Sequence, residues 1–115
     1  MRRGAIRRGD EVLWAQAALA DRFWSRARGL LGRNTMTAQE ALLIAPCASI
    51  HTVGMAFPID VLFLDSDGVI LARHPEVAPL RLLRHPRAHQ TVEAQAGSIE
   101  RLQLQHGQRL TWYSL

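Results

Sequence analysis

The order of apolar and polar residues predicts a chain of short extended segments separated by turn residues. Residues 11–20 (EVLWAQAALA) combine valine, leucine and tryptophan with alanines and favour a first strand, although the alanines leave a helix as the alternative. Residues 41–46 (ALLIAP) are too short and too apolar for anything but a buried strand, with the proline as its stop. Two later segments, 91–96 (TVEAQA) and 109–114 (RLTWYS), predict further strands, with Val92 facing inward in the first.

Residues 59–71 carry the clearest pattern in the chain. Two apolar runs, IDVLFLD and GVILA, meet at the turn Asp65–Gly68 and predict a β-hairpin. The aspartates favour the turn by bonding to nearby backbone, and Gly68 supplies a positive φ without steric cost. The DSDG string also resembles the start of a calcium loop, but Val69 takes the third carboxylate position and no glutamate follows at the bidentate position. The sequence therefore favours a turn over a calcium site.

The remaining segments contain little helix. Asp21 can cap a short helix that runs from Arg22 to about Arg28 and ends at two glycines, and GSIERLQL, from Gly97, predicts one helical turn or more. Prolines and arginines interrupt residues 73–89, which predicts irregular or short extended structure. Many short strands without a βαβ rhythm predict a mainly β fold, a small antiparallel β-barrel or sandwich with one or two short helices.

Composition and charge add a domain boundary. The 115 residues fit one domain, and 48% hydrophobic with 21% charged residues is ordinary for a folded chain. All 14 cationic side chains are arginine, and four of them precede Gly9, so the net charge of +4 belongs to the N-terminus. We expect residues 1–9 to form a flexible basic arm and residues 10–115 a single β domain. Such an arm could touch a phosphate backbone or an anionic lipid surface.

One cysteine cannot form an intramolecular disulfide, so nothing in the chain requires an oxidising compartment. Residues 12–20 are apolar behind basic residues, but Gly9, Asp10 and Glu11 directly upstream argue against a signal segment. The chain also lacks an apolar run near the roughly 20 residues that span a bilayer. We expect a soluble, cytoplasmic protein without a membrane span.

Several motifs resemble a known family. RARGLLGR (26–33), HTVGMAFPIDVLFLDSDGVIL (51–71) and EAQAGSIERLQLQHGQRL (93–110) resemble, in the same order, the domain of unknown function 192 family of small bacterial and archaeal domains. The resemblance implies a compact β-barrel or sandwich with short helices, and it implies no reaction. The positions that match the family's motifs are Arg26, Gly29, Leu30, Pro58, Asp60 and Gly97. The chain departs from many members at His51 and Thr52, where they carry a tryptophan–methionine pair.

Cys47 and His51 are the natural pair to test for a thiol-dependent enzyme, because a thiolate needs a nearby imidazole or positive charge. Four residues of extended chain span about 13 Å, which keeps the pair apart unless the chain turns. We therefore favour a packed, inert Cys47 and keep the thiol enzyme as an alternative. The histidines and acids show no recognisable zinc spacing, so we expect no metal and no cofactor.

Asp60 should be partly buried, because strand alternation places it on the same face as Leu62 and Leu64. We expect its carboxylate to accept hydrogen bonds from backbone N–H groups, from Arg26 or Arg33, or from His51. A structural role as a local cap and a role in ligand binding both remain open.

These observations favour a non-enzymatic binding or accessory module, because no complete nucleophile, base and orienting group can be assembled from the sequence. Its small pocket is expected where the Arg26 helix meets the segment from His51 to Asp60, and its partner is a small molecule or a protein. The candidate site residues are Arg26, Arg33, Cys47, His51, Pro58 and Asp60.

Nucleic-acid binding through the arginine arm is the other alternative. The arginines between residues 22 and 33 would have to extend the basic track, and only Phe23 and Trp24 could stack on bases beside it. Those two aromatic residues can equally form the core contact of the predicted helix, so nucleic acid is the less favoured partner.

Overall fold

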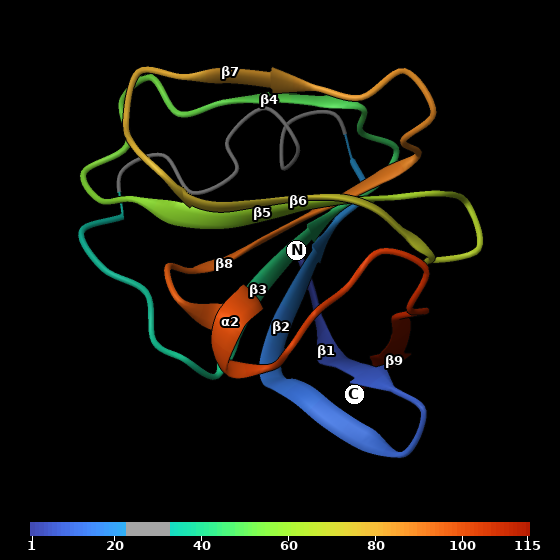
Figure 1. Cartoon of the computed structure of the whole chain (residues 1–115). Helices are drawn as coiled ribbons and strands as arrows, with labels where there is room; N and C mark the ends of the chain where they lie inside the picture. The colour runs from blue at the N-terminus through green and yellow to red at the C-terminus, as the bar shows by residue number, and fades with distance from the viewer. Residues whose placement is uncertain (23–32) are drawn as a thin grey trace.

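The computed structural model describes residues 1–22 and 33–115, and it is mainly β (Figure 1). Seven strands form one sheet in the order β6-β5-β8-β3-β2-β1-β9, and β4 and β7 form a second, two-stranded sheet. The strands are β1 (Arg2–Arg8), β2 (Glu11–Ala20), β3 (Glu40–Ile44), β4 (Ser49–His51), β5 (Ile59–Leu64), β6 (Ile70–Val77), β7 (Leu82–Arg84), β8 (Gln90–Gln95) and β9 (Thr111–Ser114). The short helix α2 (Ser98–Arg101) follows β8. The mainly β, sandwich-like fold expected from the sequence is confirmed.

The expectation of a purely antiparallel fold was wrong at one strand pair. β2 and β3 run parallel, with Gln16 opposite Glu40 and Ala20 opposite Ile44, so the large sheet is mixed and does not close into a barrel. Parallel neighbours need a crossover of a dozen or more residues, and residues 21–39 connect these two strands. A single crossover produces no repeating strand–helix rhythm in the sequence. Most of the helix predicted from Arg22 to about Arg28 lies outside the described residues.

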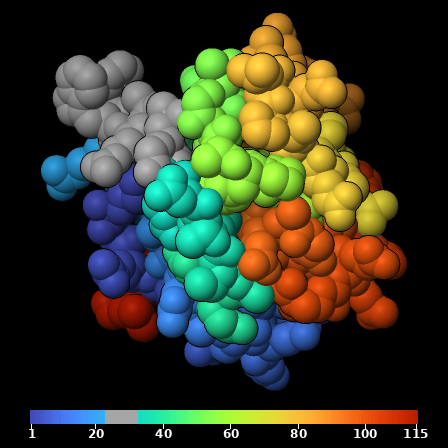
Figure 2. Space-filling model, turned by 90° about the vertical axis from the view of Figure 1, so that its left-hand side faces the viewer, coloured from blue at the N-terminus to red at the C-terminus, as the bar shows by residue number. Residues whose placement is uncertain are grey.

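Each face of the large sheet carries its own hydrophobic core. Along β5, Leu62 and Leu64 point into the first core, which α2 and the segment after it cover, while Val61 and Phe63 point into the second core. The second core is closed from above by β4 and β7, which contribute Ile50 and the half-buried Leu83 (Figure 1). In Figure 2 the segments of β4 and β7 form the upper end of the molecule. We call residues 45–58 and 78–89, which contain these two strands, the outer layer.

Two polar interactions fix the predicted hairpin of β5 and β6. The Asp65 carboxylate accepts hydrogen bonds from the backbone N–H groups of Asp67 and Val69, both at 2.9 Å, and Gly68 has a φ of 85°. This confirms the turn and the use of its glycine. Strand β6 extends to Val77, further than the sequence indicated. Pro75 is tolerated within it because β6 is an edge strand and the proline lies at a β-bulge, where no hydrogen bond to a neighbouring strand is lost.

The prediction of a flexible basic arm over residues 1–9 was wrong, because residues 2–8 form strand β1. This strand pairs with β2 on one side and with β9 on the other, so it is an interior strand of the sheet. Ile6 is 1% exposed and belongs to the first core. Burial of this isoleucine stabilises the fold by about 1.5 to 3 kcal/mol. The four arginines around it do not indicate that the segment is part of the sheet.

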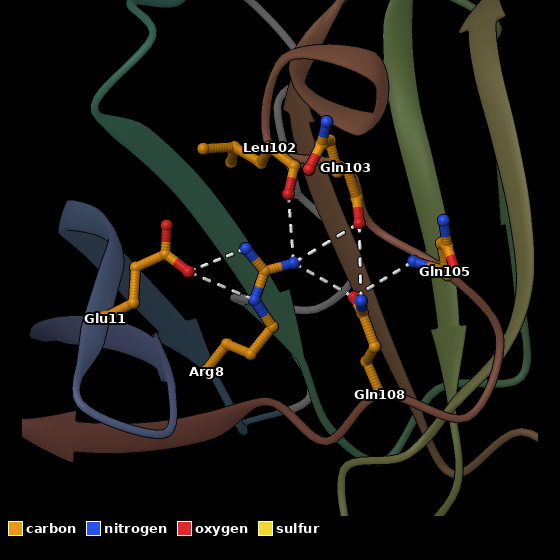
Figure 3. Close-up of polar contacts among 6 residues, drawn as sticks. All are labelled: Arg8, Glu11, Leu102, Gln103, Gln105 and Gln108. Carbon is orange, nitrogen blue, oxygen red and sulfur yellow. Dashed lines mark hydrogen bonds and ion pairs between the residues drawn. The ribbon is translucent and has the colours of Figure 1, made fainter.

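Arg8 ties the β1–β2 turn to the segment that follows α2 (Figure 3). Its Nη1 donates to the carbonyl oxygen of Leu102 at 2.9 Å and to Oε1 of Gln108 at 3.0 Å, while Nη2 donates to Oε1 of Glu11 at 2.7 Å. A planar guanidinium can satisfy acceptors on several sides at once. The arginine that suggested a solvated terminus is therefore a structural link between the two ends of the chain.

Candidate functional site

The most unusual polar group of the second core is the carboxyl of Glu93, on the central strand β8. Glu93 is 4% exposed and lies opposite Leu42 of β3 on one side and Val61 of β5 on the other. Directly opposite residues of neighbouring strands project from the same face of a sheet. Because Leu42 and Val61 both belong to the second core, the Glu93 carboxyl is placed between the large sheet and the outer layer.

Glu93 differs from its two neighbours on the same face of β8. Thr91 donates its hydroxyl hydrogen to the carbonyl oxygen of Cys47 at 3.3 Å, and Gln95 donates from Nε2 to the carbonyl oxygen of Met36 at 3.0 Å. The hydrogen bonds and ion pairs of the described residues include none to the Glu93 carboxyl, and desolvation is the cause of its pKa shift. Of these three side chains, Thr91 and Gln95 therefore have a hydrogen-bond partner among the described residues, and Glu93 does not.

Burial raises the pKa of Glu93 from its ordinary value of 4.5 to about 7. The cause is the loss of hydration, which disfavours the charged form, and no nearby positive charge among the described residues opposes it. Near neutral pH the group is therefore divided between a carboxylate and a carboxylic acid. Such a group can accept a hydrogen bond in either form and can donate one when protonated.

Two histidines lie on the same face as Glu93. His74 of β6 is opposite Val61, so Val61 separates it from Glu93 in one row across the sheet, and the His74 ring packs edge-on against Phe63 at 5.6 Å between centroids. His85 packs against Phe63 as well, at 6.2 Å. Burial, and then the nearby His85, lower the pKa of His74 and favour its neutral form. His74 and Glu93 therefore flank Val61 on this face, and both imidazoles pack against Phe63.

Cys47 lies at the margin of the second core and is half-buried. Its Sγ donates to the carbonyl oxygen of Ser49 at 3.2 Å, and its backbone N–H donates to the carbonyl oxygen of His89 at 2.9 Å. The described hydrogen bonds of the thiol include none to an imidazole. His51, the partner considered from the sequence, is exposed on β4 and lies opposite Leu82 of β7.

Of the other candidates from the sequence, the structure describes Arg33 and Pro58. Arg33 is exposed and binds Glu40 at 2.6 Å, and this hydrogen bond, followed by that from the Thr37 N–H, lowers the pKa of Glu40. Pro58 is exposed just before β5. Arg26 lies outside the described residues. The described part of the chain contains no group of three or more histidine, cysteine, aspartate or glutamate side chains that could hold a metal ion.

Asp60 is buried, at 1% exposure, but on the opposite face of the sheet from Glu93. Its Oδ1 accepts the N–H of Glu76 at 2.8 Å, and its Oδ2 accepts the N–H of Ile99 at 2.8 Å. Glu76 has a φ of 50° in the β6 bulge, and Ile99 lies in the first turn of α2, whose N-cap Gly97 offers no side chain. Asp60 therefore secures a strained bulge and a helix end from a third element. This confirms the expected burial and backbone hydrogen bonds.

Sequence reasoning missed Glu93 because the alternation in TVEAQA predicts that only one face of this strand, the face of Val92, is buried. Val92 is fully buried as predicted, but Thr91 and Glu93 on the other face are buried too. The available signal was the position of this strand after the hairpin, which allows it to pair with β5 on one side and β3 on the other. A central strand covered on both faces has no solvent side for a glutamate.

The structure also bears on membrane insertion. In the part of the chain that the structure describes, no helix is both long and apolar enough to cross a bilayer.

Two solved structures share this fold. A Sinorhizobium meliloti protein, provisionally named as a transcription regulator, is 25% identical with a TM-score of 0.78, and the match covers 84% of this chain and 81% of that one. A protein of unknown function from Novosphingobium aromaticivorans is 20% identical with a TM-score of 0.77, covering 84% and 74% of the two chains. No curated protein matches the chain at a significant level.

The motifs that suggested a family are supported by a match along almost the whole chain. The family model of the domain of unknown function 192, described as Uncharacterized ACR, matches residues 5–112. This range includes strands β2 to β8 and helix α2 in full, and parts of β1 and β9. The family's description names no activity. The chain belongs to the domain of unknown function 192 family.

Proposed function

We propose that the protein is a non-enzymatic binding module that holds a small ligand between the large sheet and the outer layer, with Glu93 as its polar anchor. The observation that carries the proposal is that Glu93 is 4% exposed as a residue and that its carboxyl has no hydrogen-bonding or ionic partner among the described residues. Buried polar side chains in folded proteins nearly always have a partner, so an exception calls for an explanation. A ligand supplies one.

The comparison with Asp60 supports this interpretation. Both carboxyls are buried on central strands of the same sheet, and Asp60 accepts two backbone hydrogen bonds where Glu93 accepts none among the described residues. A carboxyl kept for stability is expected to look like Asp60. A carboxyl kept at a cost to stability is typical of a functional position.

The surroundings define the chemistry of the ligand. Leu42 and Val61 flank the carboxyl, and Phe63 with His74 lies further along the same face. A ligand that fits these groups has an apolar or aromatic body and one amine, amide or hydroxyl group that donates to Glu93. A cationic amine would favour the carboxylate and lower its pKa, so binding near pH 7 would release a proton.

A binding role agrees better with these contacts than catalysis does. The Cys47 thiol donates to a backbone carbonyl oxygen, and the described residues supply no imidazole hydrogen-bonded to it. A thiol nucleophile needs a base within hydrogen-bond reach, and that base needs an orienting group. We place the protein in the cytoplasm, where a lone cysteine stays reduced, with a small molecule or a protein as its partner. Nucleic acid is not the proposed partner.

The test is calorimetry of the purified protein against a panel of small aromatic and aliphatic amines and amides. At least one compound should bind wild type with a heat that depends on the buffer, because a proton is exchanged near pH 7. Glu93→Gln should weaken this binding by about tenfold or more, since a charge-assisted hydrogen bond is lost. Glu100→Gln, at an exposed position on α2, is the matched control and should bind as wild type does.

Two results would contradict the proposal. Equal affinity of wild type and Glu93→Gln for every compound that binds would show that Glu93 is not the anchor. Turnover of an ester, phosphoester or peptide substrate that is lost in His51→Ala would replace the binding module with an enzyme.

A further inference from the structure

The charged residues of the outer layer are all basic. Residues 78–89 contain three arginines and two histidines without an acid, and residues 45–58 contain no acid either. The side chains of Arg81, Arg84 and Arg87 are exposed. The rest of the chain therefore holds all ten acids, and the outer layer is a positively charged end of a molecule whose remaining arginines are in part paired with acids.

Exposed aliphatic side chains lie within this basic surface. Leu80 is 73% exposed, Leu82 is 71% exposed and Val53 is 54% exposed. The backbone segments that carry them adjoin at one end of the β4–β7 pair, because the Leu80 N–H donates to the carbonyl oxygen of Thr52 at 3.3 Å and Leu82 lies opposite His51. Single exposed apolar residues are ordinary on protein surfaces, but a cluster of them rimmed by charge marks an interaction site.

The loop that carries Leu80 is held in place from below. The buried hydroxyl of Thr52 donates to the carbonyl oxygen of Ala78 at 2.8 Å and accepts the N–H of Arg81 at 2.8 Å, which fixes the chain on both sides of Leu80. Leu80 itself has a φ of 67°, a conformation that is unfavourable for a bulky residue. A leucine kept exposed at a strained position is not explained by folding, and strain of this kind concentrates at functional positions.

We propose that the outer layer binds an anionic lipid surface along the β4–β7 pair, with Leu80, Leu82 and Val53 entering the interface and Arg81, Arg84 and Arg87 contacting lipid phosphates. Aliphatic side chains beside arginines match the two attractions that hold peripheral proteins on membranes, apolar insertion and charge. Single-stranded nucleic acid is the less suitable occupant, because stacking on bases needs exposed aromatic rings and the only aromatic residue among Phe, Trp and Tyr in these segments is the half-buried Phe57.

The test is flotation of the purified protein with lipid vesicles. Vesicles of equal parts phosphatidylglycerol and phosphatidylcholine should carry the protein, and phosphatidylcholine alone should not. Raising the salt from about 50 mM to about 500 mM should release it, because the screening length falls severalfold. Arg84→Gln with Arg87→Gln should weaken binding by roughly 25-fold, at about fivefold per arginine near an anionic surface.

The apolar contribution is tested separately. Leu80→Ser with Leu82→Ser should weaken binding by about tenfold or more, since two exposed leucines would no longer enter the interface. The matched control replaces the same residue types away from the outer layer, Leu115→Ser with Arg109→Gln, and should bind within about twofold of wild type. All of these side chains are exposed, and urea midpoints close to that of wild type verify that each variant is folded.

Three outcomes would overturn the proposal. The first is equal binding to both kinds of vesicle or to neither. The second is equal weakening in the control variant. The third is binding without vesicles, either to an oligonucleotide, to an acidic peptide such as polyglutamate, or to a second copy of the chain that sedimentation detects and the two leucine substitutions abolish.

Discussion

Replacing Glu93 by glutamine should make the protein more stable, and the gain should depend on pH. In the folded protein burial raises the pKa of Glu93 to about 7, against an ordinary value of 4.5 that describes the unfolded chain. Between these two values the folded state holds a proton that the unfolded chain has released. The free energy of unfolding of wild type therefore falls as pH rises through this window and levels off above it.

The magnitude follows from the separation of the two pKa values. At about 1.4 kcal/mol for each pH unit, the separation between 4.5 and about 7 corresponds to about 3 kcal/mol. Glutamine has nearly the same shape and does not titrate. Glu93→Gln should therefore match wild type near pH 4 and exceed it by about 3 kcal/mol near pH 8.

Urea denaturation of both proteins at several pH values measures this difference. His74, whose pKa is lowered by burial and then by His85, titrates in both proteins, so its contribution cancels when the two curves are subtracted. Parallel pH profiles would refute the reasoning. They would show that Glu93 is hydrated or has a partner in the folded protein, and the proposed ligand site would lose its main support.

Three further predictions concern positions outside the proposed ligand site. Asp60→Ala should lower the free energy of unfolding by about 2 to 4 kcal/mol in a urea titration, because it strands the buried N–H of Ile99 and the part-buried N–H of Glu76; a variant as stable as wild type would exclude the structural role. Gly68→Ala should lower the melting temperature by several degrees, since its Cβ would overlap the Leu110 carbonyl oxygen and its φ is 85°; an unchanged melting temperature would contradict this. Leu80→Gly should leave stability unchanged or raise it by up to about 1 kcal/mol by removing strain at φ 67°, and a loss above about 1 kcal/mol would assign Leu80 to the fold instead.

The sequence by itself determined the local elements. Alternation and turn residues identified the β5–β6 hairpin with its Asp65–Gly68 turn, strand β2 to the residue, and the helical turn after Gly97. These features depend on contacts within a few residues, such as the Asp65 carboxylate with the N–H groups that follow it. The burial of Asp60 could be predicted as well, because the side chains of a strand alternate between its two faces.

Only the tertiary structure decided which strands are neighbours and which faces are covered. β1 looked like a basic arm until β2 and β9 paired with it, and the parallel pairing of β2 with β3 depends on a crossover that leaves no local pattern. Glu93 reads as the solvent side of an alternating strand, and it is buried because β3 and β5 flank it while the outer layer covers them. The cost of desolvating a carboxyl depends on atoms far away in the sequence, so a periodic pattern within β8 cannot reveal it.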